Sequence, residues 1–235
     1  MTRVGLVALG LACLVAGCVR TSEGVPVAAD SGTTAASSVP SVPSAPSATS
    51  QPTQESDPSA FGVVPTTRAP VPPNTVACPQ PINPGVRMAA QVKDSQAPKI
   101  TVGVPEGWSM SAGSGDIGGQ LAGPDGMTAT VTIAQTQLDP AAAFKKYADD
   151  LMEEAAVSSV SVLPGQLCEY SGQKLMGAWS DTPQNAVEFK DRIAHVWTNS
   201  GNDYLVSVHV QAPTDTAGFD DAASVLTEDF EIVLP

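Results

Sequence analysis

The stretch VEFKDRIAHVWTNSGNDYLVSVHV, residues 187–210, decides the fold of this chain. Residues 204–210 carry an apolar side chain at every second position, which is the two-residue period of a strand with one buried face. The apolar members of this alternation are Tyr204, Val206, Val208 and Val210. Residues 187–198 are also typical of a strand, and the segment 199–203 between the two runs is rich in turn-forming residues. The stretch therefore predicts an antiparallel hairpin of two long strands.

Further strands are expected on both sides of this hairpin. Short runs rich in β-branched residues, bounded by Gly, Pro and Asp, predict them. The expected strands are residues 99–105, 120–122, 128–134, 160–163, 174–180 and 230–234. Pro124-Asp125-Gly126 is typical of a tight turn between two of them. Such closely spaced strands favour an antiparallel arrangement.

Two helices interrupt the strands. Asp139-Pro140 is a typical helix start, with a capping carboxylate before a proline in the first turn. Phe144, Tyr147 and Leu151 follow at helical spacing, and acidic and basic residues occupy the opposite face. Residues 216–227 predict the second helix. The order of strands, helix, strands, helix and strand predicts an α+β domain whose mainly antiparallel sheet carries two packed helices.

The N-terminus is typical of a bacterial lipoprotein. Arg3 precedes an apolar run that is too short to cross roughly 30 Å of hydrocarbon as a permanent helix. Val15-Ala16-Gly17-Cys18 matches a lipobox, so residues 1–17 are predicted to be a cleaved signal peptide. Cys18 would then be acylated, with palmitate or a similar chain, and would anchor the protein to the outer face of the cell membrane. An ordinary cleaved signal followed by a chance cysteine is the alternative.

Residues 18–77 are predicted to form the anchor residue and a disordered spacer. Ten prolines and eighteen serines or threonines lie between positions 19 and 77. Such a composition buries too little apolar area to offset its chain entropy. The spacer would hold a single folded domain, residues 78–235, away from the membrane.

Two cysteines remain in this domain, Cys78 and Cys168. An even pair in an oxidising compartment favours a disulfide between them. A reactive thiol or a metal pair is the alternative, but neither cysteine has a His or a second Cys at metal-ligand spacing. We therefore expect neither a metal nor another cofactor.

The domain is acidic, with eight Lys or Arg against twenty Asp or Glu. A negatively charged domain gains nothing from contact with a phosphate backbone, so nucleic acid is not expected as a partner. Anionic lipid headgroups would repel it as well. The acyl anchor, and not surface charge, is therefore the predicted attachment to the membrane.

The sequence contains no recognisable catalytic motif. It has neither Gly-x-Ser-x-Gly nor His-Glu-x-x-His, and its two histidines are His195 and His209. His195 lies on the predicted apolar face of its strand and is expected to be a packed histidine. His209 lies on a polar face and is expected to be solvated or close to a helix. We expect no catalytic residue, although a hydrolase that uses the carboxylates or His209 stays open as an alternative.

Three tryptophans are the candidates for a binding site. Trp108, Trp179 and Trp197 are expected to pack in the core or, as the sharper alternative, to line an apolar cavity for a ligand.

The segment Ile100-Thr101-Val102-Gly103-Val104-Pro105-Glu106-Gly107-Trp108, together with the lipobox and the helix start at Asp139-Pro140, resembles the LpqN/LpqT family of mycobacterial lipoproteins. The resemblance covers about residues 95–235. It implies a fold similar to Mog1 and PsbP, and a cell-envelope protein without known catalytic residues. The pair Cys78 and Cys168 is not a general feature of that family.

Together these features predict a non-enzymatic envelope lipoprotein that binds a lipid, a glycolipid or an envelope protein. Two alternatives stay open. One is a hydrolase that acts on envelope glycans or esters, and the other is a structural or antigenic surface protein without a ligand.

Overall fold

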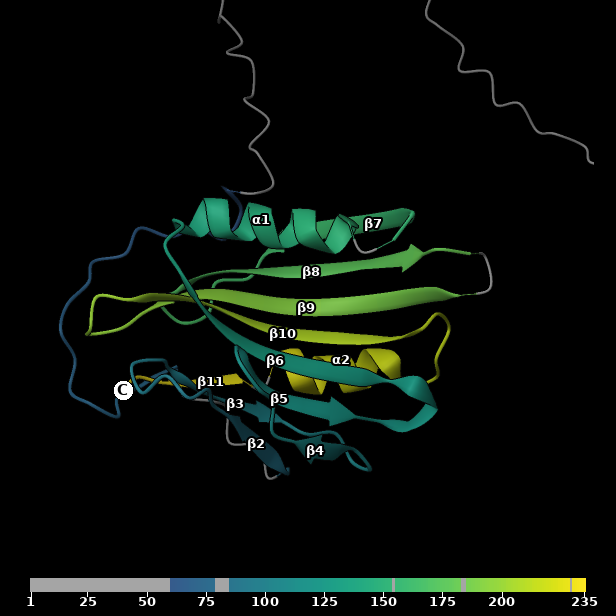
Figure 1. Ribbon diagram of the computed structural model, residues 1–235, viewed down its shortest axis with the longest axis horizontal. Coiled ribbons are helices and arrows are strands. Elements are labelled where there is room, and N and C mark those ends of the chain that lie inside the picture. The colour runs from purple at the N-terminus through teal and green to yellow at the C-terminus, as the bar shows by residue number, and fades with distance from the viewer. Residues whose placement is uncertain (1–59, 79–84, 154, 183–184, 229) are drawn as a thin grey trace, which may run out of the picture. The chain divides into compact units, whose positions relative to one another are not determined.

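The computed structural model describes residues 60–78, 85–153, 155–182, 185–228 and 230–235. The predicted signal peptide, Cys18 and the predicted spacer up to residue 59 lie outside the described residues. Two sheets and two helices make up the described part (Figure 1).

A seven-stranded antiparallel sheet dominates the fold. In spatial order its strands are β4 (Ser109–Ser111), β5 (Ile117–Ala122), β6 (Thr128–Thr136), β10 (Asp203–Pro213), β9 (Ala186–Trp197), β8 (Ser171–Ser180) and β7 (Val157–Pro164). A 3₁₀ turn, η2 (Pro124–Gly126), connects β5 to β6. Each strand is antiparallel to the neighbours with which it pairs.

The predicted hairpin forms the centre of this sheet. Strands β9 and β10 pair from Trp197 opposite Asp203 to Val187 opposite Pro213. The side chains of Tyr204, Val206, Val208 and Val210 are all at most 1% exposed. The two-residue period thus identifies the buried face correctly, because every second side chain of a strand points to the same side of the sheet.

A smaller sheet of four strands packs against the large one, and the two sheets share the main core. Its order is β1 (Val76–Cys78), β11 (Phe230–Val233), β3 (Lys99–Gly103) and β2 (Arg87–Ala90), and every pair is antiparallel. Helix α2 (Phe219–Glu228) packs on β3 of this sheet and on β9 and β10 of the large sheet. Ala223 and Leu226 of the helix have no exposed surface, so α2 lies within the main core.

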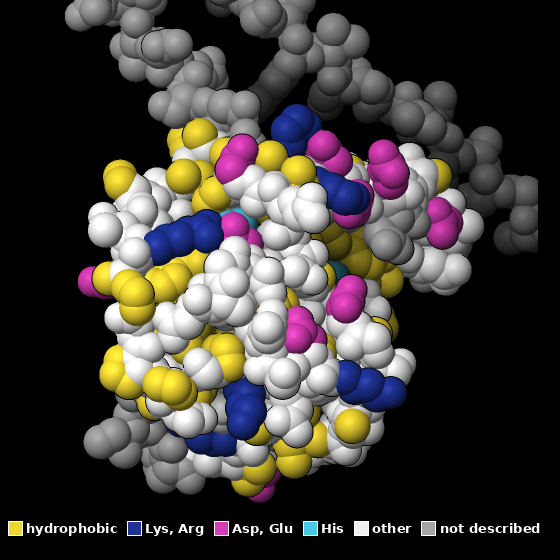
Figure 2. Space-filling view, turned by 60° about the vertical axis from the view of Figure 1, so that its left-hand side comes forward, with side chains coloured by type: hydrophobic (Ala, Val, Ile, Leu, Met, Phe, Trp, Pro, Cys, Tyr) yellow, Lys and Arg dark blue, Asp and Glu magenta, His cyan; other side chains and the backbone are white. Residues whose placement is uncertain are grey.

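Helix α1 (Pro140–Glu153) covers the other face of the large sheet at its β7–β9 end (Figure 1). Oδ1 of Asp139 accepts a hydrogen bond of 2.9 Å from the backbone N–H of Ala142, which is the predicted N-cap. Phe144 and Leu151 pack on β8 and β9 in a second core. The exposed face of α1 carries the ion pairs Lys145–Asp149 and Lys146–Asp150, and charged side chains of both signs gather at the top of the domain in Figure 2. The predicted α+β class is confirmed.

Residues 60–78, which we call the arm, differ from the prediction. Nε2 of Gln173 donates a hydrogen bond of 2.7 Å to the carbonyl oxygen of Phe61, and the N–H of Val64 donates one of 2.9 Å to Oγ of Ser171. Gly62 has a φ of 78°, and a Cβ there would lie 1.8 Å from the carbonyl oxygen of Gly172. The prediction of a disordered spacer through residue 77 is therefore wrong for residues 60–77. A proline-rich segment forms few internal hydrogen bonds, so its peptide groups remain available to the edge of a folded domain.

No helix in the described part of the chain has the length and the apolar character needed to cross a bilayer.

Candidate functional site

A groove lies between the arm and the body of the domain. Its volume is about 610 Å³, which is within the range of ligand pockets in proteins. Its wall is formed by arm residues between Val64 and Ala77, its floor by Cys168, Tyr170, Trp197 and Leu234, and the exposed Glu169 lies at its edge. We call it the arm groove.

Two aromatic residues dominate the floor. The ring centroids of Tyr170 and Trp197 lie 6.1 Å apart, with the planes inclined at 57°. Tyr170 is 4% exposed, and burial, followed by the charge of Glu169, raises the pKa of its hydroxyl to about 12. The phenol therefore stays neutral at physiological pH, and the floor presents uncharged aromatic surface to the groove.

A disulfide fixes the floor to the wall. Cys78, at the end of β1, is bonded to Cys168, and their Cα atoms are 5.5 Å apart. Cys168 lies in a tight turn with a φ of 56°, and Leu167 and Tyr170 close this turn with two backbone hydrogen bonds of 2.9 and 3.1 Å. The predicted pairing of the two cysteines is present, and it joins the arm to the turn that carries Tyr170.

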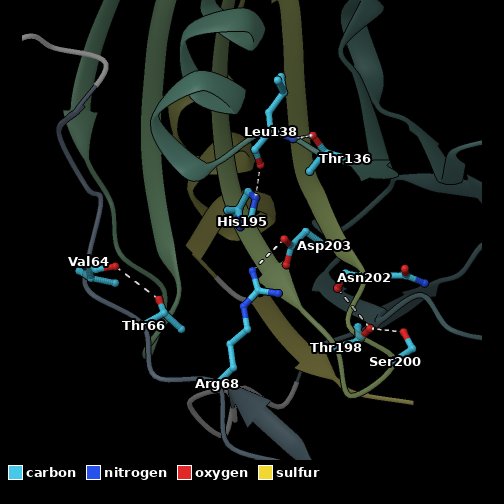
Figure 3. A network of polar contacts seen from close by, with 10 residues as sticks. All are labelled: Val64, Thr66, Arg68, Thr136, Leu138, His195, Thr198, Ser200, Asn202 and Asp203. Atoms are coloured by element: carbon cyan, nitrogen blue, oxygen red, sulfur yellow. Dashed lines mark hydrogen bonds and ion pairs between the residues drawn. The ribbon is translucent and has the colours of Figure 1, made fainter.

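Polar contacts hold the arm across the ends of β9 and β10. Arg68 makes an ion pair of 2.8 Å with Asp203, as Figure 3 shows. Asn199 makes two hydrogen bonds to the backbone of Val71: Nδ2 donates to the carbonyl oxygen at 2.7 Å, and Oδ1 accepts from the N–H at 3.1 Å. Because both partners lie in or beside the hairpin turn, these contacts hold the arm against the end of the β9–β10 hairpin.

The rim of the groove is polar and carries little charge. Thr66, Thr67 and Thr75 provide its hydroxyl groups. Thr66 and Thr75 donate theirs to the carbonyl oxygens of Val64 and Pro72, so their oxygens remain as acceptors. Glu169 is the charged residue among the described residues that line it. The groove is thus apolar at its floor, hydroxylated at its rim and negative at one point.

The three predicted tryptophans do not meet in one cavity. Trp108 is buried in the main core, where its ring lies against Gly123, so that a Cβ at that glycine would be 2.4 Å from Cε2 of the indole. Trp179 packs on Phe189 with ring centroids 4.9 Å apart. Trp197 is the one of the three that lines the arm groove.

His195 is a packed strand histidine. It is 5% exposed, and its Nε2 lies 2.9 Å from the carbonyl oxygen of Leu138, in the connection between β6 and α1 (Figure 3). This agrees with the expectation for this residue.

His209 belongs to a polar cluster that the sequence did not predict. Its Nδ1 lies 2.8 Å from Oδ1 of Asp191, and Oδ2 of the same carboxylate accepts a hydrogen bond of 2.8 Å from the hydroxyl of Tyr147. The side chain of Asp191 has no exposed surface. The imidazole also stacks on Trp179, with the planes inclined at 7° and the centroids 5.7 Å apart. The helical spacing of Tyr147 is the one signal for this cluster in the sequence, because the pairing of Asp191 with His209 depends on the register of β9 against β10.

The cluster has the Asp–His half of a catalytic triad, and a triad would also need a hydroxyl or a thiol at Nε2 of the imidazole. Nε2 of His209 lies 3.2 Å from Oε1 of Gln211, an amide oxygen that cannot attack a substrate. The hydroxyl of Ser207 interacts with the hydroxyl of Tyr147. Among the described residues, no group of three His, Cys, Asp or Glu side chains is placed to hold a metal ion.

No protein-family model matches the chain, and no curated protein matches it. A solved structure of LpqN, described as involved in cell envelope biogenesis of Mycobacterium tuberculosis, is similar to it with a TM-score of 0.49 and 20% sequence identity. The similarity covers 64% of this chain and 92% of that chain. The identity and the score are both too low for the function of that protein to be transferred.

Proposed function

We propose that this chain is a non-enzymatic protein of the cell envelope that holds an amphiphile, a lipid or a glycolipid, in the arm groove. The observation that carries the proposal is the pair of aromatic rings, Trp197 and Tyr170, on the floor of a 610 Å³ groove with a hydroxylated rim. An apolar floor with a few polar groups at the edge is the usual pattern of small-molecule sites.

The size of the groove suits part of an acyl chain. Burial of about eight methylene groups contributes roughly 6 kcal/mol. That is comparable to the several kcal/mol that association costs in lost translational and rotational freedom. The polar head of the ligand therefore has to supply much of the remaining affinity through contacts at the rim.

The rim favours an uncharged, hydroxylated head group. The hydroxyl oxygens of Thr66, Thr67 and Thr75 would accept hydrogen bonds from the hydroxyl groups of a sugar. The carboxylate of Glu169 opposes a phosphate or a sulfate at the same place. A glycolipid with a neutral sugar head fits these contacts better than an anionic phospholipid.

The lipobox supports a location at the outer face of the membrane. In the sequence, Cys18 precedes the arm, and an acyl anchor there would keep the protein beside a supply of amphiphiles. The arm is one wall of the groove, so it would contact the ligand. It also follows the predicted anchor residue in the chain.

Native mass spectrometry tests the proposal. The Cys18→Ser protein keeps the whole chain but cannot be acylated at that position, and it would be produced in a host with a lipid-rich envelope. We expect a reproducible extra mass that solvent extraction removes and that Trp197→Ala reduces. A bare protein mass before extraction would contradict the proposal and would favour an envelope protein as the partner.

One observation favours hydrolysis as a second candidate function. Asp191 orients His209 in the manner of a catalytic dyad, with 2.8 Å between Oδ1 and Nδ1. A panel of aryl esters and aryl glycosides, with the Cys18→Ser protein and its His209→Gln variant, tests this candidate. Turnover that the variant loses would support hydrolysis, and equal background rates for both proteins would exclude it for these substrates.

A further inference from the structure

One face of the large sheet is only partly covered. Helix α1 packs on β7, β8 and β9, whereas β6, β5 and β4 lie beyond it at the other side of the sheet (Figure 1). Thr130 of β6 is opposite Gln120 of β5 and His209 of β10, so these three side chains share this face. Gln120 is exposed, and Thr130 and His209 are half-buried. We call the part of this face on β4, β5, β6 and β10 that α1 leaves open the open face.

The part of the open face on β4 and β5, at residues 128–132 of β6 and at residues 209–211 of β10 carries no Asp, Glu, Lys or Arg, although the chain has a net charge of −13. Asp203 lies on the same side at the start of β10, where it pairs with Arg68 of the arm. Strand pairing places seven polar residues on the uncharged part besides His209. They are Ser109, Ser111, Gln120, Thr128, Thr130, Thr132 and Gln211. The charges gather elsewhere, for example on the exposed side of α1. A surface of hydroxyl and amide groups offers no opposite charge to a charged partner, so such a partner would gain no electrostatic attraction at this face.

The hydroxyl groups are regularly spaced. Thr128, Thr130 and Thr132 alternate along β6, so their side chains repeat at about 6.6 to 6.8 Å. At the side of α1 the face deepens into a hollow of about 280 Å³, to which Thr132, Tyr147 and Ser207 contribute and which the ion pair Lys146–Asp150 of α1 borders. The row of hydroxyls thus leads into a concave part of the same surface.

Two stacked aromatic side chains, Trp179 and His209, border the face on the side of β8 and β9, and we call this pair the aromatic step. Trp179 and His209 stack nearly parallel, and the buried carboxylate of Asp191 fixes the imidazole by its Nδ1. The negative face of an aromatic ring attracts the partly positive C–H groups of a pyranose ring. Trp179 and His209 are half-buried at this border, so a pyranose ring that lies along the row of hydroxyls can pack its C–H groups against them.

We infer that the open face is a binding surface for a neutral polysaccharide. A sugar polymer offers hydroxyl groups at regular intervals, carries no charge and exposes C–H faces, which match the threonine row, the neutral surface and the aromatic step. This surface contains none of the described residues that line the arm groove. The inference therefore does not depend on the lipid ligand proposed above.

Affinity electrophoresis of the Cys18→Ser protein tests the inference. The probes are dextran, mannan and hydroxyethyl cellulose, all neutral, with polygalacturonate as an anionic comparison. We expect retardation by at least one neutral polymer and none by polygalacturonate. No retardation by any of the three neutral polymers would overturn the inference.

Charge introduced on the open face should abolish the retardation. Gln120→Glu changes an exposed side chain with little change of shape, and Thr130→Glu places a carboxylate at the centre of the row. Each should weaken binding about tenfold or more, because the new charge loses water without gaining a partner. Ser161→Glu, on an exposed position of β7, is the matched control and should leave binding unchanged. Unchanged retardation in both face variants would overturn the inference.

Self-association is the competing use of such a face. Light scattering of the Cys18→Ser protein, in which the open face is unchanged, should show a monomer at the concentrations of the binding assay. A dimer that Gln120→Glu dissociates would identify the face as an interface between two copies of the chain and would overturn the polysaccharide inference.

Discussion

Oδ1 of Asp191 lies 2.8 Å from Nδ1 of His209, and both residues point to the same side of the large sheet from neighbouring strands. The second oxygen of the carboxylate accepts a hydrogen bond from Tyr147 of α1. One fully buried carboxylate thus connects two strands and a helix. It also sets the orientation of the imidazole that stacks on Trp179.

Loss of this carboxylate should destabilise the domain. Asp191→Leu leaves the hydroxyl of Tyr147 and Nδ1 of His209 without this acceptor, and we expect it to lower the free energy of unfolding by about 2–4 kcal/mol. Urea denaturation measures the change. Asp149→Asn, which breaks an exposed ion pair on α1, is the control and should cost about 0.5 kcal/mol or less. Equal effects of the two substitutions would contradict the role of Asp191.

The three tyrosines should resist ionisation. Burial is the main cause that raises the pKa of Tyr170 and Tyr204 to about 12, and it also raises the pKa of Tyr147 well above 10, with the charge of Asp191 as the next cause. Absorbance at 295 nm should show little phenolate in the native protein at pH 10, where a free tyrosine is half ionised.

The same shifts set the sign of the alkaline pH dependence. A raised pKa in the folded state means that folding favours the protonated phenol. This contribution to stability is complete below pH 10 and is lost as the pH rises from 10 through 12. A free energy of unfolding that increases over this interval would contradict the assignment.

The disulfide should make a large contribution to stability. It closes a loop with a sequence separation of 90 residues, and the chain-entropy estimate for such a loop is about 4.5 kcal/mol. We expect Cys78→Ser/Cys168→Ser to lose up to that amount in urea denaturation. A reducing agent should destabilise the parent protein and leave the double variant unchanged. Free thiols on both cysteines in non-reducing peptide mapping would refute the bond.

The lipobox makes a prediction of its own. Mass spectrometry of the N-terminal peptide of the membrane-bound protein should find Cys18 as the first residue, with diacylglyceryl and acyl groups attached. An unmodified N-terminal Cys18 would refute the anchor, and with it the proposed supply of amphiphiles to the groove.

Local patterns in the sequence predicted the elements of the fold well. The alternation at residues 204–210 identified the buried face of β10, and Asp139-Pro140 identified the start of α1. Both signals act within a few residues of the chain. An even count of two cysteines in the domain left one simple pairing, which the structure contains.

Relationships over long distances in the sequence could not be predicted in the same way. The arm docks on Ser171 and Gln173, more than 100 residues away, through contacts to its backbone that its proline-rich composition does not reveal. The cluster of Asp191 and His209 depends on the register of β9 against β10, which no local pattern specifies. Trp108, Trp179 and Trp197 were grouped by residue type, and the fold separates them.

The quenching of Trp197 by a brominated acyl chain tests the central claim most directly. The chain has three tryptophans, so Trp197 is the single tryptophan in the Cys18→Ser/Trp108→Phe/Trp179→Phe protein. We predict that a glycolipid with bromine on its acyl chain quenches this fluorescence in a saturable manner and that the unbrominated lipid does not. The companion protein Cys18→Ser/Trp108→Phe/Trp197→Phe, which keeps only Trp179 and an aromatic ring at position 197, should not be quenched at lipid concentrations at which native mass spectrometry still finds the lipid bound. Absence of quenching at Trp197, or equal quenching of both proteins, would contradict a ligand in the arm groove.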